Sequence, residues 1–276
     1  MKDIFKDAAV KKEKLEREFS DLSESIITGV VGTNGPGAGK VPADKYWSLN
    51  LSLVAWKELG GEINNSSLIL SKDLTDDELK DIQAKVKSKS LVQFKVKLSK
   101  ISPFGDARAQ LISILDAPDD IDLDAALEKF KEPVEVTHKE FGDFILDKSV
   151  DWFEGNVSWV GKSIRVSVSI DEDNGSPEGG FKTIEALHRD ASRWSKKITK
   201  YAVSELLELK NDIWLMEGQQ ELTAKNFVDS MQLESIAVYP DGEFEFWHND
   251  GGLFWGHSIL ISGSLSDGPN DADIPG

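Results

Sequence analysis

The chain has 276 residues, and a hydrophobic content of 39% with eight Trp is enough for one large or two ordinary domains. It contains no Cys, which excludes disulfides, thiolate metal sites and a cysteine nucleophile. No apolar run is long enough to span a bilayer, and the first residues lack the apolar segment of a signal peptide. We therefore expect a cytoplasmic protein with no membrane partner.

The charge of the chain is strongly acidic and unevenly distributed. The formal net charge is −17. Because nucleic-acid binding depends on clustered Lys and Arg that contact phosphates, we expect no nucleic-acid partner. Residues 1–136 hold 20 basic and 24 acidic side chains, whereas residues 137–276 hold 12 and 25. The acidic C-terminal half either keeps the protein soluble or steers it toward a basic protein partner.

The N-terminal half mixes helical and extended patterns. Apolar residues recur at near-helical spacing over residues 3–24, and a short helix ends near Lys131. Thr75-Asp-Asp-Glu78 has the capping-box pattern of a helix start. Strands are expected at about 25–31, 45–56, 63–70, 90–101 and 107–115. These elements predict a small α+β domain with a mixed, strongly curved or barrel-like sheet.

A glycine-rich segment, Gly32-Thr-Asn-Gly-Pro-Gly-Ala-Gly-Lys40, invites comparison with a phosphate-binding P-loop. A P-loop would require Gly at position 34 and Ser or Thr at position 41, where this chain has Asn34 and Val41. No helical pattern follows the segment, so no helix N-terminus is available for a phosphate. We expect a mobile hairpin loop here.

A second domain is expected after Glu132-Pro133, with domain boundaries of 1–133 and 134–276. Its strongest signal is the alternation of Ile164, Val166, Val168 and Ile170 with polar residues, which is typical of a strand with one buried face.

The remaining elements of this domain complete the order β-β-β-α-α-β-β-β. Apolar residues at three- and four-residue steps predict a long helix over about 181–210, and Thr223 is the expected N-cap of a second helix. The other strands are expected at about 141–147, 151–159, 233–239, 243–248 and 254–265. The order predicts an antiparallel sheet with helices packed on one face.

The segment from Glu243 to Ile259 is the most distinctive part of the chain. It holds five aromatic residues and two of the four His, with a tight turn at Asn249-Asp-Gly-Gly252. Residues 226–276 around it contain nine acids and no Lys or Arg. Strand alternation places Phe244 and Phe246 on one face. The adjacent Phe254 and Trp255 point to opposite faces, so only one of them can lie in the core.

This hairpin carries the predicted functional surface. An aromatic anchor ringed by carboxylates has the composition of an interaction hot spot. The predicted contact residues for a basic protein partner are Glu243, Glu245, Trp247, Asp250 and Trp255. The competing interpretation is that the aromatic rings cover the sheet or pack at the domain junction.

A metal-dependent enzyme is the alternative function. His248, Asp250 and His257 lie within ten residues, and two His with a carboxylate can bind a transition metal. Against this, Asp250 lies in a turn, where Asp is common, and His257 is expected to be buried and hydrogen-bonded. No Gly-x-Ser-x-Gly elbow occurs and no Ser–His–acid set can be assembled. We predict no cofactor and no catalytic residue.

The polar side of the long predicted helix is basic. It carries Arg189, Arg193, Lys196, Lys197 and Lys200. We expect these side chains to be solvated, or else to meet the acidic hairpin within the domain or across a homodimer.

Three segments of the C-terminal half resemble a known bacterial family. They are Gly142-Asp-Phe-Ile-Leu-Asp-Lys-Ser-Val-Asp-Trp-Phe-Glu-Gly155, Leu206-Leu-Glu-Leu-Lys-Asn-Asp-Ile-Trp214, and Gly242-Glu-Phe-Glu-Phe-Trp-His-Asn-Asp-Gly-Gly-Leu-Phe-Trp-Gly-His-Ser-Ile259. Over roughly residues 137–276 the chain resembles the uncharacterised domain of unknown function numbered 2262, and the preceding half looks like its usual companion domain.

The resemblance implies a fold and carries no activity to this chain. By analogy, acidic proteins of this kind are suspected to be immunity proteins of bacterial toxin systems. The leading hypothesis is therefore a non-enzymatic protein-binding module, in particular an immunity protein against a basic toxin domain. A structural or housekeeping protein whose acidity only serves solubility is a third hypothesis.

Overall fold

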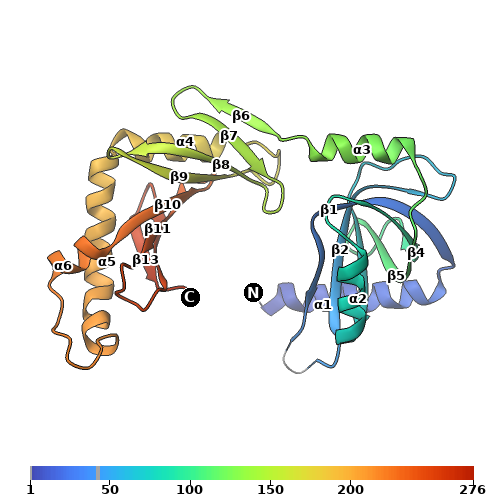
Figure 1. Ribbon diagram of the computed structural model, residues 1–276, viewed down its shortest axis with the longest axis horizontal. Helices are drawn as coiled ribbons and strands as arrows, with labels where there is room; N and C mark the ends of the chain where they lie inside the picture. Colours follow the sequence, from blue (N-terminus) through green and yellow to red (C-terminus); the bar gives the residue numbers. More distant parts are fainter. Residues whose placement is uncertain (1, 42–43) are drawn as a thin grey trace. The chain divides into compact units, whose positions relative to one another are not determined.

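The computed structural model describes residues 2–41 and 44–276, without the side chains of residues 2–6 and 8. The chain divides into two compact units, Met1–Glu132 and Pro133–Gly276, with the division one residue from the expected boundary. Both units mix helices and strands, as predicted (Figure 1). No helix in the described part of the chain is long and apolar enough to cross a membrane.

The N-terminal unit is a closed five-stranded barrel with strand order β1-β2-β3-β5-β4. Its helices are α1 (Lys2–Asp21), α2 (Asp76–Lys85) and α3 (Ile121–Lys131). Its strands are β1 (Glu24–Gly39), β2 (Trp47–Glu58), β3 (Leu68–Leu74), β4 (Leu91–Ser99) and β5 (Ala107–Leu115). Neighbouring strands are antiparallel except for the parallel pair β3 and β5. This arrangement, with a helix between β3 and β4, is that of OB-fold barrels, which serve many functions.

Local sequence signals explain two features of the barrel. Alternating residues such as Leu51, Leu53 and Phe94 are fully buried and fill its interior. The predicted capping box at the start of α2 is confirmed. The Thr75 amide donates to a carboxylate oxygen of Glu78 over 2.8 Å, and the Glu78 amide donates to Thr75 Oγ1 over 3.3 Å.

The expected glycine-rich loop is instead part of strand β1. Residues 36–39 pair with residues 48–51 of β2, after register shifts between Val30 and Pro36. The prediction of a loop over residues 32–39 was wrong because Gly and Pro are tolerated in strands at bulges, where the ladder of hydrogen bonds is already interrupted. Gly35, with φ of 61°, lies in the irregular segment.

The C-terminal unit contains an eight-stranded sheet with strand order β13-β12-β11-β10-β9-β8-β7-β6. Its strands are β6 (Glu135–His138), β7 (Gly142–Asp147), β8 (Trp152–Trp159), β9 (Lys162–Ser169), β10 (Gln232–Val238), β11 (Glu243–Asn249), β12 (Ser258–Ser264) and β13 (Gly268–Asp273). Its helices are α4 (Glu178–Arg189), α5 (Ala191–Ile213) and α6 (Ala224–Ser230).

This unit differs from the predicted domain in two details of the sheet and one of the helices. The central strands β9 and β10 are parallel, because α4, α5 and α6 form the crossover between them, and the other neighbours are antiparallel. The sheet gains two short edge strands, β6 and β13, whose sequences carry little apolar alternation. The predicted long helix is broken at Asp190, which ends α4 and precedes α5.

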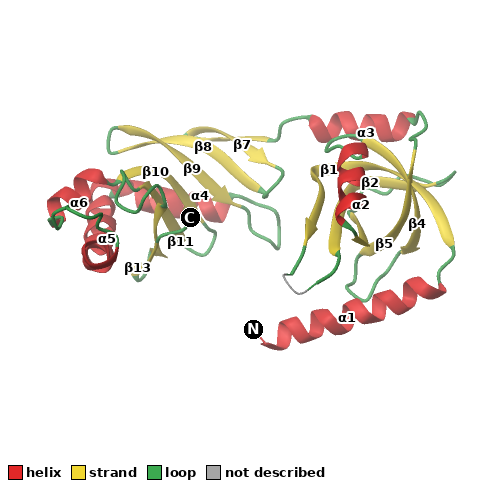
Figure 2. Ribbon diagram, turned by 60° about the horizontal axis from the view of Figure 1, so that its bottom comes forward, coloured by secondary structure: helices red, strands yellow, loops and turns green. Residues whose placement is uncertain are grey.

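One face of this sheet forms the core together with the helices. Inward residues of β8, β9 and β11 join residues of α4 and α5, such as Ile184 and Ile198, in one buried cluster. Figure 2 shows α4 running along strands β8 to β10. Strand side chains on the opposite face of the sheet do not belong to this core cluster, and many of them are partly or fully exposed.

Candidate functional site

Strand β11 distributes its side chains between the two faces of the sheet, as the alternation predicted. Phe244 and Phe246 are each 1% exposed and His248 is 7% exposed, so these three lie on the helix-covered face. Glu243, Glu245 and Trp247 take the alternate positions, and their register partners across the strands are on the outward face.

An aromatic and carboxylate cluster lies at the centre of the outward face. The carboxylate of Glu245 accepts hydrogen bonds from the Tyr239 hydroxyl at 3.0 Å and from Trp247 Nε1 at 2.9 Å. The ring of Trp152 packs edge-on against Tyr239, with 5.3 Å between centroids. Burial, together with the negative charge of Glu245, raises the pKa of Tyr239 well above its ordinary value, so its hydroxyl stays protonated and donates to Glu245.

The strand register gives the neighbours of Glu245 and Trp247 on the outward face. Glu245 is flanked by Ala237 and Ser262, and Trp247 by Ser235 and Leu260. Three of these four neighbours are small, so they leave room beside the larger side chains of Glu245 and Trp247.

The outward face is strongly acidic. Outward positions of β7, β8, β11 and β13 carry further carboxylates at Asp143, Asp147, Glu154, Glu243, Asp271 and Asp273. Arg165 is the one basic side chain at the outward positions of β6 to β13, all of which the structure describes. We call this surface, centred on Trp152, Tyr239, Glu245 and Trp247, the acidic sheet face.

Asp250 does not belong to this surface. It is 3% exposed, and its carboxylate accepts the amides of Gly252 at 3.1 Å, Phe254 at 2.6 Å and Gly256 at 3.1 Å. Burial opposes the charged form, but these amide donors outweigh it and hold the pKa of Asp250 below its usual range. The Asp250 carboxylate therefore shapes the turn after β11, and the predicted contact of Asp250 with a partner finds no support in its buried position.

Trp255 is exposed but lies away from the acidic sheet face. Its side chain is 58% exposed, whereas its neighbour Phe254 is fully buried, so only one of the two is core, as predicted. Its ring packs against Trp214 at the end of α5, with 4.8 Å between centroids. Trp255 therefore lies in the turn beyond β11, on the side of the helices.

The three residues of the alternative metal site do not converge. His248 lies on the core face, Asp250 is saturated by backbone amides, and His257 packs edge-on against Trp214. The expected hydrogen bond of His257 is also missing at Nδ1, which has no partner among the described residues. Nowhere in residues 2–41 and 44–276 does a group of three potential His, Asp or Glu ligands form.

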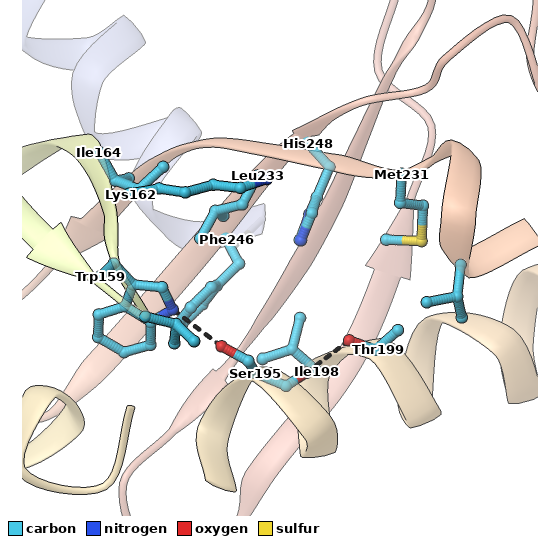
Figure 3. A pocket seen from close by; sticks show the side chains of 12 residues that line it. Trp159, Lys162, Ile164, Ser195, Ile198, Thr199, Met231, Leu233, Phe246 and His248 are labelled. Atoms are coloured by element: carbon cyan, nitrogen blue, oxygen red, sulfur yellow. Dashed lines mark hydrogen bonds between the residues drawn. The ribbon is translucent and has the colours of Figure 1, made fainter. Parts of the chain in front are cut away.

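A cavity of about 250 Å³ lies on the helix-covered side, next to His248. Figure 3 shows the imidazole pointing from β11 toward α5, where Ser195, Ile198 and Thr199 line the opposite wall. Trp159 Nε1 donates to Ser195 Oγ over 2.9 Å at one end. Sequence reasoning missed this cavity because its walls come from four strands and two helices; the inward position of His248 was the only signal.

The basic residues of α5 stay apart from the acidic sheet face. Among the described ion pairs, none joins the side chains at positions 189, 193, 196, 197 and 200 to an acid of β11. Lys197 instead lies over the ring of Trp194, with its Nζ 4.2 Å from the centroid.

Two family models match the chain, one for each unit. The model described as an uncharacterized protein conserved in bacteria (DUF2262) matches residues 138–274. A domain of unknown function (DUF7021) matches residues 11–130. No curated protein and no solved structure matches the chain.

Proposed function

We propose that this chain, which joins an N-terminal DUF7021 domain to a C-terminal DUF2262 domain, is a non-enzymatic protein-binding module. The acidic sheet face would bind a basic surface of another protein. The observation that supports this most directly is the Glu245 cluster, in which one carboxylate holds both Tyr239 and Trp247 on an otherwise acidic face.

The geometry of the cluster suits recognition rather than proton transfer. Both donors to Glu245 are already paired, and the raised pKa of Tyr239 keeps its hydroxyl protonated, so neither donor is poised to give up its proton. Because the indole N–H of Trp247 is satisfied, its ring offers mainly apolar surface to a partner. Rigid aromatic surface surrounded by charge is the usual composition of an interaction hot spot.

Charge determines the kind of partner. Acidic residues outnumber the single Arg165 on this face, so a basic patch gains attraction and faster encounter, both weakened by salt. The outward carboxylates can contact the charged groups of Lys or Arg, and the ring of Trp247 can contact their aliphatic stems.

A charge-reversal experiment tests the assignment. Glu243 and Asp273 are exposed and leave the Glu245 hydrogen bonds intact, so the double variant E243K/D273K changes charge without breaking the cluster. The matched control is E217K/E221K, which reverses two exposed acids in the segment between α5 and α6. Tagged full-length chains are used to capture proteins from the source bacterium, with quantification by mass spectrometry.

A basic protein captured by the unchanged chain and by E217K/E221K, but lost with E243K/D273K and with Trp247→Ala, would support the proposal. Its binding should weaken by at least about tenfold as salt rises from low to physiological concentration. A partner retained equally by all variants would remove the acidic sheet face as the binding surface.

The immunity role is the narrower form of this proposal, and it has a separate test. The captured protein should be toxic when expressed alone, and coexpression of the unchanged chain should restore growth while E243K/D273K fails to do so. A captured partner without toxicity leaves the binding function and excludes the immunity role.

A further inference from the structure

The cavity beside His248 has the size and walls of a small-molecule site. Its volume is about 250 Å³, and its walls are mainly apolar, from Trp159, Ile164, Ile198, Val228, Leu233 and Phe246. Apolar cavities of about 150 Å³ take up benzene in other proteins, which scales to about ten heavy atoms here. An organic molecule with an aromatic or branched aliphatic body therefore fits the space.

His248 provides an unsatisfied polar group in these apolar surroundings. The residue is 7% exposed, and its Nδ1 is buried without a hydrogen-bond partner among the described residues. Burial lowers the pKa of His248 to about 4, so the ring is neutral near pH 7 and offers one N–H donor and one acceptor nitrogen. The backbone carbonyls of Phe246 and Ile259 favour the protonated ring, and a ligand carboxylate beside the imidazole acts in the same direction.

A cation lies at the same cavity. The Lys162 side chain extends from β9 along the cavity toward Leu233 (Figure 3), and its ammonium forms no ion pair with any described residue. The first ten residues of α5, 191–200, add four basic side chains and no acid on the helix that forms the opposite wall. In a chain of net charge −17 this local excess of positive charge favours an anionic ligand group.

We propose that this cavity binds a small organic carboxylic acid. Its apolar body lies between Phe246 and Ile198, and its carboxylate is held by Lys162 and by the imidazole of His248. The Ser195 hydroxyl, which accepts the Trp159 indole, still has its own hydrogen to donate to the ligand. The site lies on the sheet face opposite the acidic sheet face, so it is independent of protein binding there.

The test uses the full chain and a matched pair of probes, 3-phenylpropionate and the uncharged 3-phenylpropan-1-ol. Calorimetric titration measures affinity, and side-chain nitrogen signals, assigned with His248→Gln, report whether the His248 ring contacts the probe. We expect a sub-millimolar Kd for the acid, about tenfold weaker binding of the alcohol, and a shift of the His248 signals.

Three variants distinguish this site from adventitious binding. Lys162→Gln should abolish the preference for the acid, whereas Lys182→Gln, which removes an exposed charge from α4, should preserve it. Val228→Phe should fill the cavity and remove binding of both probes. Equal binding of acid and alcohol, an acid preference that survives Lys162→Gln, or binding that leaves the His248 signals unmoved would each overturn the proposal.

Discussion

Replacement of Asp250 by Ala tests whether one buried carboxylate organises the turn after β11. The variant leaves three backbone amides without their acceptor. The Phe254 amide belongs to a fully buried residue, so its loss costs about 1–3 kcal/mol as an unsatisfied donor. Gly252 and Gly256 are exposed, so water can replace the carboxylate there at about 0.5–1 kcal/mol each.

The expected destabilisation is therefore about 2–5 kcal/mol, a large part of the stability of a typical domain. Burial lowers the pKa of Lys210, and the charge of Asp250 acts against this effect, so removal of Asp250 makes the charged form of the buried Lys210 less favourable. Asp250→Asn keeps an acceptor oxygen, so its free energy of unfolding should fall by only about 1–2 kcal/mol.

Urea unfolding of the full chain, followed by Trp fluorescence, measures these losses, since Trp214 and Trp255 lie near the turn. The matched control is Asp241→Ala, which removes an exposed turn Asp that accepts one amide, that of Glu243 at 3.2 Å, and should cost less than about 1 kcal/mol.

The pH dependence of the Asp250→Ala difference has a definite sign. The pKa of Asp250 is lower in the folded state, so its stabilising effect is complete above the unfolded pKa near 4 and is lost as pH falls through the folded value. A loss no larger than that of Asp241→Ala at pH 7, or one that stays constant down to pH 3, would refute the role assigned to this carboxylate.

Three further outcomes are expected. The pKa of His248 is about 4 in the folded state against an ordinary 6.5, so this residue binds fewer protons when the chain is folded. Lowering the pH from about 6.5 to 4 should therefore reduce the free energy of unfolding by about 3 kcal/mol more in the unchanged chain than in His248→Gln, as measured by urea unfolding. Gly155→Ala would place a methyl group 2.7 Å from the Phe144 ring, and calorimetric melting should show a loss of about 1–3 kcal/mol. Thr75→Ala removes the cap of α2, and chemical denaturation should show a loss of about 1 kcal/mol in the free energy of unfolding.

Features that depend on neighbouring residues in the sequence were predictable. The capping box at Thr75 and the two-sided pattern of β11 follow from local spacing, and the structure has both. The apolar periodicity also located the strands of the core, because buried faces require it. Short edge strands such as β13 escape this reasoning, since their pairing comes from the neighbouring strand rather than from their own side chains.

The site residues show where local reasoning ends. Asp250 in a glycine-rich turn was readable as an exposed turn acid, but the three amides that fold around its carboxylate depend on the full course of residues 250–256. In the same way, the cavity beside His248 needs α5 placed across the sheet, and no spacing within β11 encodes that placement.

Strand β11 links the two proposed sites while keeping them separable. Phe246 is packed in the core and His248 is buried on the same face, so Trp247 between them lies on the other face. A rigid strand of this kind suits a recognition surface, because side chains held by packing lose little freedom on binding. Glu243→Lys on β11 changes only the outward charge, and Lys162→Gln on β9 changes only the charge beside the cavity. Loss of carboxylic-acid binding with protein capture intact, and the reverse, are therefore both attainable with single substitutions, so failure of either proposal leaves the other testable.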